Sequence, residues 1–181
     1  VILTPLRNFL QKYIDRFFYR ETYDYRQILL NFSNKISNVL DLKELAQSIL
    51  DPVIQAMHVK QASLLFPGDD SSEYKTRFAQ SCKQSPAIRL KMSADSPIVA
   101  WLNAEGSVLR RELIETIPKL KGLWESEKNT LNILEIELLC PIRSKGQLDG
   151  ILILGKKQSD TAYSEEEIDL LTTMANEAAI A

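Results

Sequence analysis

Histidine and cysteine, two residue types that often carry out catalysis or bind metals, are scarce in this chain. It contains one histidine and two cysteines among 181 residues, and it has no run of 18 apolar residues that would span a membrane. His58 has no evident second ligand beside it, as a metal or haem site would require. The sequence therefore predicts no metal site and no catalytic residue, and no cofactor is evident.

An excess of charge of one sign is also lacking. The 22 basic residues nearly balance the 24 acidic ones, which leaves a net charge of −2. This balance gives no overall attraction to nucleic acid or to anionic lipid, and no basic stripe or stacking aromatic motif indicates a nucleic-acid partner. Cys82 and Cys140 do not form a disulfide framework or a zinc-ligand spacing. A reducing cytoplasm is the expected compartment.

The length is sufficient for one domain with a good core and an extension. The chain begins at Val1 rather than at methionine, and its last expected helix stops abruptly at Ala181. We expect both ends to be cuts in a longer polypeptide.

Residues 1–23 predict an amphipathic helix, because their apolar residues recur at helical spacing. Basic residues outnumber acidic ones in this segment, and they are Arg7, Lys12, Arg16 and Arg20. Two interpretations stay open: a plain linker helix, or a juxtamembrane helix on the cytoplasmic side of a membrane. The second would place a membrane anchor of the parent protein upstream of Val1.

A further helix is expected from about Tyr25 onward. Its apolar residues step by threes and fours and form a heptad-like seam, which consists of Tyr25, Leu29, Phe32, Ile36 and Val39. Such a seam can pack on its own domain or on a twin helix. We take these five residues as the candidate interface of a homodimer.

Residues 24–181 predict one α+β domain. Alternating or continuous apolar runs near 61–66, 74–78, 88–92, 135–142 and 148–154 indicate strands. Of these, 148–154 is nearly all apolar, so we expect it to be central and buried on both faces. In 135–142, four residues are expected on one side of the strand: Ile136, Leu138, Cys140 and Ile142.

Helix signals lie between and after these strands. Asp41 is expected to open a helix in which Pro52 causes a kink or a division into two helices. Ser96 and Gly106 bracket a short helix. In 107–134 the spacing suggests two helical pieces, one around Leu109 that ends at Pro118, and one around Lys128.

The last forty residues carry the clearest motifs. A turn at 144–147 joins two apolar runs into a hairpin. Ser164 and Glu167 then form a capping box, in which each side chain bonds the backbone amide of the other, at the start of the final helix.

The order C-P-I-R-S-K-G, then L-D-G-I-L-I-L-G, then Y-S-E-E-E, resembles the end of a GAF domain, a small sensory module of bacterial signalling proteins. The resemblance covers about 28–181. It implies a GAF-like α+β fold with a central antiparallel sheet of five to six strands, helices on both faces and a long N-terminal helix.

The resemblance also implies a function without catalysis in this chain. The segment 5–26 resembles the piece that joins membrane helices to GAF domains in some bacterial sensor histidine kinases. We therefore expect a dimeric sensory domain of a two-component sensor histidine kinase, which relays ligand or conformational state to a downstream kinase module. The parent protein would transfer phosphate from ATP to a histidine beyond Ala181. The sensory domain of a transcription activator is the alternative.

An enzyme is a third interpretation. Some GAF-fold proteins reduce free methionine sulfoxide with a nucleophilic and a resolving cysteine. Those proteins share a C-G pair and an H-I-x-C-D segment, and neither occurs here. Cys140 lies in an apolar strand, where a cysteine usually acts as a small hydrophobe.

A ligand pocket is expected from the resemblance, since GAF ligands lie against one sheet face under the segment between the third and fourth strands. That segment is here about 93–134. The candidate pocket, for an unknown small molecule, consists of Trp101, Leu109, Arg110, Leu113, Trp124, Leu131 and Cys140. Arg110 would meet an anion. Alternatively, the apolar members simply fill the core.

Overall fold

The computed structural model describes residues 25–36, 41–82 and 86–179. A six-stranded antiparallel sheet with the order β3-β2-β1-β6-β5-β4 forms its centre. The strands are β1 (Gln61–Pro67), β2 (Glu73–Ser81), β3 (Lys91–Ser93), β4 (Leu109–Arg110), β5 (Ile136–Ser144) and β6 (Gln147–Gly155). The α+β fold class is confirmed. The helix predicted at 1–23 lies outside the described residues.

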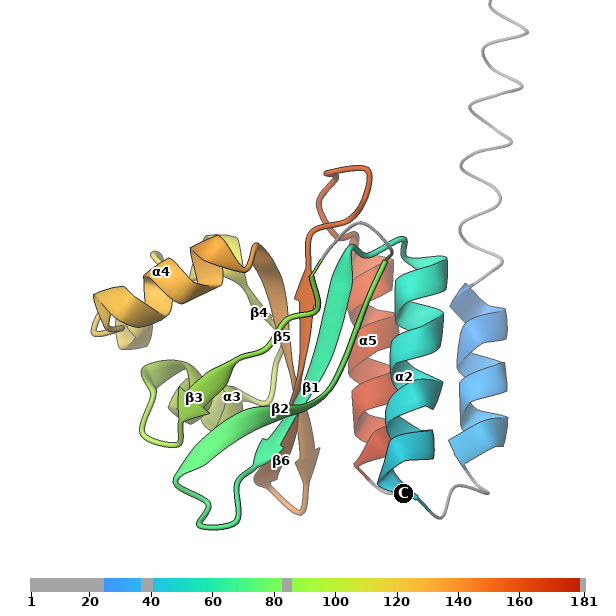
Figure 1. The fold of residues 1–181 in the computed structure, drawn as a ribbon, viewed down its shortest axis with the longest axis horizontal. Coiled ribbons are helices and arrows are strands. Elements are labelled where there is room, and N and C mark those ends of the chain that lie inside the picture. Colours follow the sequence, from blue (N-terminus) through green and yellow to red (C-terminus); the bar gives the residue numbers. More distant parts are fainter. Residues whose placement is uncertain (1–24, 37–40, 83–85, 180–181) are drawn as a thin grey trace, which may run out of the picture.

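Helices cover both faces of the sheet (Figure 1). One face carries α2 (Leu42–Ala56), α5 (Glu165–Ala178) and the helical segment 25–36, and the other carries α3 (Pro97–Glu105) and α4 (Glu125–Ile133). Two short 3₁₀ helices, η1 (Arg111–Leu113) and η2 (Pro118–Leu120), precede α4. None of the helices within the described residues is long and apolar enough to cross a membrane.

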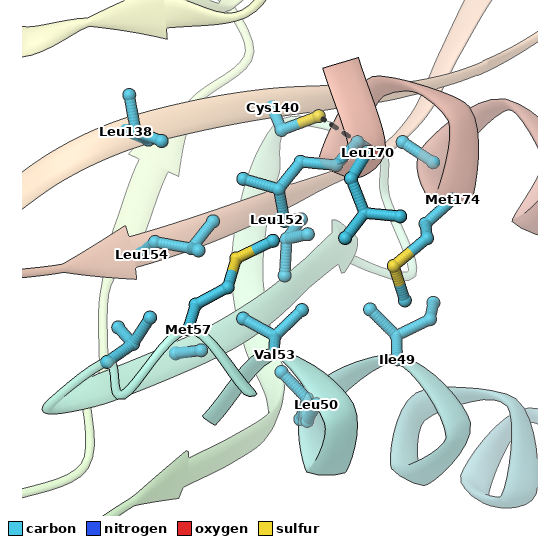
Figure 2. Packing of buried hydrophobic residues seen from close by; sticks show 14 of the residues in the cluster. Ile49, Leu50, Val53, Met57, Leu138, Cys140, Leu152, Leu154, Leu170 and Met174 are labelled. Carbon is cyan, nitrogen blue, oxygen red and sulfur yellow. Dashed lines mark hydrogen bonds between the residues drawn. The ribbon is translucent and has the colours of Figure 1, made fainter. Parts of the chain in front are cut away.

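The sheet separates two hydrophobic clusters. Alternation along β6 sends Leu152 and Leu154 to the α2/α5 face and Ile151 and Ile153 to the α3/α4 face. Figure 2 shows the first cluster, in which α2 and α5 close over Leu152. The prediction that this strand is central and buried on both faces is confirmed, because β6 lies between β1 and β5.

The predicted turn and caps form as expected. Lys145 and Gly146 have φ angles of 49° and 83°, as a tight two-residue hairpin turn requires. Ser96 caps α3, and Gly106 ends it with a φ angle of 64°, which is the left-handed conformation that glycine adopts most readily.

Three local expectations are wrong. Leu109 lies in the two-residue strand β4 rather than in a helix, and Pro118 opens η2 instead of ending a helix. Of the two outcomes expected at Pro52, the division into two helices is wrong, because one helix runs from Leu42 to Ala56 with Ile49 and Val53 buried on either side of the proline.

On β5, Leu138, Cys140 and Ile142 share the α2/α5 face as predicted, but Ile136 faces α3 and α4. The pairing register with β6 shifts between Ile136 and Leu138. Such a bulge reverses the side on which the preceding residue points.

Candidate functional site

The start of α5 carries a buried carboxylate with several partners. Glu167 is 2% exposed, and its Oε2 accepts from the backbone amide of Ser164 at 2.8 Å. The hydroxyl of Ser164 accepts in return from the amide of Glu167 at 3.2 Å. The capping box predicted from the sequence is thereby confirmed, and it fixes the carboxylate at the positive end of the helix dipole.

Two further side chains bind the same carboxylate. Lys157, which is 13% exposed, places Nζ 2.7 Å from Oε1 of Glu167 and donates to Oε2 at 2.8 Å. The hydroxyl of Tyr25 donates to Oε1 at 3.0 Å. Because the carboxylate is buried, its charge requires these donors, and the group would be costly to leave unpaired.

Tyr163 completes this cluster of side chains. Its ring lies 5.5 Å from Nζ of Lys157, within the range of a cation–π contact. Its hydroxyl donates to the carbonyl of Gly155 at 2.6 Å. Burial raises the pKa of Tyr163, and the nearby Glu167 carboxylate raises that pKa further. The phenol therefore stays neutral and acts as a hydrogen-bond donor.

We call Tyr25, Lys157, Tyr163, Ser164 and Glu167 the α5 junction. It joins three segments that are distant in the chain: the helical segment 25–36, the connection after β6 and the first turn of α5. The arrangement holds no group that is poised to attack a substrate. What it can do is fix the position of one terminal helix relative to another.

A cleft of about 420 Å³ opens beside the α5 junction, and we call it the rim cleft. Its lining carries four basic and four acidic residues: Lys60, Arg110, Arg111, Lys156, Glu112, Glu135, Glu137 and Asp160. Tyr163 belongs to both the rim cleft and the α5 junction.

The charges of the rim cleft largely satisfy one another. Lys60 donates to Asp160 at 2.8 Å, and this hydrogen bond raises the pKa of Lys60 and lowers the pKa of Asp160. Lys156 pairs with Glu135 at 3.0 Å. The rim cleft therefore favours no ligand of a particular charge.

A smaller hollow of about 240 Å³ lies between β3 and α4, and we call it the α4 groove. Its apolar floor includes Met92, Ile98 and Leu131, all buried. Trp124 and Glu127, both at the start of α4, also line it.

The seven predicted pocket residues do not converge on one cavity. Trp124 and Leu131 share the α4 groove, while Trp101 and Leu109 pack into the cluster on the same face. Leu113 is exposed.

Arg110 and Cys140 lie elsewhere. Arg110 lines the rim cleft, where its guanidinium bonds the Glu165 carboxylate at the start of α5. Cys140 faces α5, on the opposite side of the sheet from α4, and its thiol donates to the carbonyl of Leu171 at 3.7 Å (Figure 2). Burial raises the pKa of the Cys140 thiol to about 12.

The predicted dimer seam packs on its own domain. Phe32 is 1% exposed within the cluster on the α2/α5 face, and Tyr25, Leu29 and Ile36 pack against that cluster. Val39 lies outside the described residues. The sequence allowed the seam to pack on its own domain or on a twin helix. In the structure it packs on its own domain, because α2 and α5 offer an apolar surface at that position.

Lys157 of the α5 junction and Glu127 of the α4 groove were not predicted from the sequence as site residues. The capping box identified Glu167, but no local pattern joins it to a lysine ten residues earlier or to a tyrosine 142 residues away. Glu127 is the third residue of a helix, where carboxylates are common, so its position alone gives no sign of a site. The sequence also does not show that β3 lies close to the start of this helix.

Comparison with known proteins agrees with this architecture. The family model described as "GAF domain" matches residues 39–181. No curated protein matches the chain.

Several solved structures share the fold. The GAF domain from a phosphoenolpyruvate-protein phosphotransferase of Coxiella burnetii is 18% identical, with a TM-score of 0.63, and the match covers 87% of this chain and 92% of that one. Residues 122 to 287 of a methyl-accepting chemotaxis protein are 14% identical, with a TM-score of 0.63 and coverage of 82% and 93%. Free methionine-R-sulfoxide reductase from Neisseria meningitidis is 14% identical, with a TM-score of 0.60 and coverage of 86% of each chain.

Proposed function

Because the chain belongs to the GAF domain family, we propose that it is a non-catalytic sensory domain that relays a change of state between its terminal helices. The observation that carries this proposal is the hydrogen bond from Tyr25 to Glu167. Through it, the helical segment 25–36 and the first turn of α5 share one buried carboxylate.

The relay works as a two-state packing of helices. Segment 25–36 and α5 both pack against α2 and the sheet, so a shift of one changes the contacts available to the other. A ligand shifts such an equilibrium only by binding one arrangement more tightly than the other. Tyr163 provides a route for this coupling, since it contacts both the rim cleft and Lys157.

The parent protein is proposed to be a bacterial two-component sensor histidine kinase, with this domain on the cytoplasmic side and a kinase module after it. The support is the sequence resemblance of 5–26 and of the last forty residues. The phosphotransferase and chemotaxis proteins with the same fold have other outputs, and a transcription activator remains the alternative. The sequence of the parent beyond Ala181 distinguishes these outputs directly.

We also propose that the domain forms a homodimer. The inward side of segment 25–36 is occupied by its own core, so the contact must use the outward side, where Leu30 is 55% exposed.

The reductase alternative has little support. Cys140 is 1% exposed and its thiol pKa is raised to about 12, so the reactive thiolate is scarce. Cys82 follows β2, which is three strand spacings from β5, or about 14 Å. Turnover of free methionine sulfoxide by the wild type, abolished in Cys140→Ser, would establish this activity; absence of turnover removes it.

Hydrogen exchange tests the relay. Tyr25→Phe removes one hydrogen bond to a charged acceptor, worth about 1.5–3 kcal/mol at most. We expect the amides of 25–36 and of the first turn of α5 to exchange about tenfold faster in this variant.

Tyr74→Phe is the matched control, because it also removes a hydrogen-bonded phenolic hydroxyl, here one that donates to the carbonyl of Leu148 away from the terminal helices. Faster exchange confined to 25–36, with α5 unaffected, would disprove the relay.

A further inference from the structure

A glutamate that lines the α4 groove has one carboxylate oxygen without a hydrogen-bond partner. Oε2 of Glu127 is buried, yet no hydrogen bond reaches it. The position of Glu127 at the third residue of α4 suits the helix dipole, but the dipole does not supply a donor to this oxygen. Buried polar atoms in native structures nearly always have a partner, so a missing one calls for an explanation.

An exposed indole lines the same groove as Glu127. Trp124, the residue that caps α4, lines the same groove and is 56% exposed. Aromatic faces attract cations, and tryptophan does so most strongly. Trp124 and Glu127 thus offer two features that both favour positive charge, above a floor of apolar side chains.

The lysine that lines the α4 groove already has an ion-pair partner. Lys91 lines the α4 groove, but its Nζ lies 3.7 Å from the carboxylate of Glu73, and its side chain is 71% exposed to solvent. The lysine therefore leaves Oε2 of Glu127 without a donor.

We propose that the α4 groove binds a small organic cation, either a protonated or a quaternary amine. The ammonium group would lie between the Glu127 carboxylate and the Trp124 ring, and the attached carbon chain would contact Met92, Ile98 and Leu131. At about 240 Å³ the groove is smaller than the typical pocket for drug-sized molecules, which suits a ligand of few atoms. This inference rests on the proposed sensory function, for which it names the class of ligand.

Isothermal titration with choline tests the charge requirement. Choline chloride is compared with 3,3-dimethylbutan-1-ol, which has the same shape without the charge, and with butylammonium chloride as a primary amine. We expect saturable binding of at least one cation below about 10 mM, a range that calorimetry reaches for millimolar affinities. Binding of the neutral alcohol should be at least about tenfold weaker.

Three variants locate the site. Glu127→Gln keeps the shape and removes the charge, and Trp124→Leu removes the aromatic face; each should weaken cation binding about tenfold or more. Glu125→Gln changes an exposed carboxylate two residues earlier and should leave binding unchanged. Thermal melting confirms that each variant is folded.

The inference is overturned if neither cation binds saturably, if the neutral alcohol binds equally well, or if Glu127→Gln binds like the wild type. Hydrogen exchange of α5 in the presence of choline separates this result from the relay. Cation binding that depends on Glu127 but leaves α5 exchange unchanged supports the site and counts against the relay. If no cation binds, but Tyr25→Phe speeds amide exchange in both segment 25–36 and the first turn of α5, the result supports the relay and counts against the cation site.

Discussion

The hydroxyl of Tyr25 donates to Oε1 of Glu167 at 3.0 Å, across 142 residues of chain. The acceptor is itself held by Lys157 and by the backbone of Ser164, so its position is fixed on the α5 side. A movement of segment 25–36 must therefore either carry the first turn of α5 with it or break a bond to a buried charge.

Glu167→Gln should destabilise the domain by about 3–5 kcal/mol, because it leaves the Lys157 ammonium nearly buried without a counter-ion. The double variant Glu167→Gln with Lys157→Met should lose less, since it removes the unpaired charge. Urea denaturation followed by circular dichroism measures both. A double variant less stable than the single one would contradict this account.

Substitutions in segment 25–36 distinguish its two sides. Phe32→Glu places a charge in the core and should cost at least about 3 kcal/mol. Leu30→Glu changes a side chain that is exposed in the single domain, so the stability of the isolated monomer should change by less than about 0.5 kcal/mol.

Leu30→Glu also tests the homodimer. Light scattering at micromolar concentration should give a dimer for the wild type and a monomer for Leu30→Glu. Leu42→Glu, at another exposed leucine on a neighbouring helix, should remain dimeric. A monomeric wild type would end the proposal.

The two cysteines should differ in reactivity. At pH 8, iodoacetamide should leave Cys140 unmodified in the folded domain, because its thiol is buried and its pKa is raised to about 12. Mass spectrometry of the Cys82→Ser variant follows Cys140 alone. The thiol should react fully once urea unfolds the chain, and rapid labelling of the native protein would show that α5 opens readily.

Stability should fall as the pH rises above about 9. The pKa of Cys140 is raised from 9.0 to about 12 on folding, so the thiol contributes its full stability below pH 9. Between pH 9 and 12 the unfolded chain loses the proton and the folded chain keeps it, at about 1.4 kcal/mol per pH unit. Cys140→Ala should flatten this decline between pH 8 and 10 in urea titrations; an equally steep decline would mean that other groups cause it.

Pro52→Ala should stabilise α2 by about 1–2 kcal/mol. Proline has no amide hydrogen, so the carbonyl four residues earlier in the helix lacks its usual donor. The gain is reduced because proline also restricts the unfolded chain. The melting temperature reports the change, and Gln55→Ala, at an exposed site on α2, serves as the control.

Features specified by neighbouring residues were predictable. The capping box of Ser164, the turn at Gly146 and the end of α3 at Gly106 depend on a few adjacent residues, and all three formed as expected. The course of α2 through Pro52 was not predictable, since contacts with distant strands outweigh the local cost.

The candidate site was harder to predict than the fold. Cys140 and Leu131 are near each other in the sequence, yet they lie on opposite sides of the sheet. The face on which a strand residue such as Cys140 lies depends on the pairing register and on bulges. The sequence likewise did not show whether Phe32 packs on a twin helix or on its own domain, because the surface that Phe32 contacts is formed by remote parts of the chain.

The sheet is bordered by strands of three and two residues, β3 and β4. Each of these two strands offers few backbone groups to a foreign strand, and short edge strands are one of the devices by which natural sheets limit pairing with other chains.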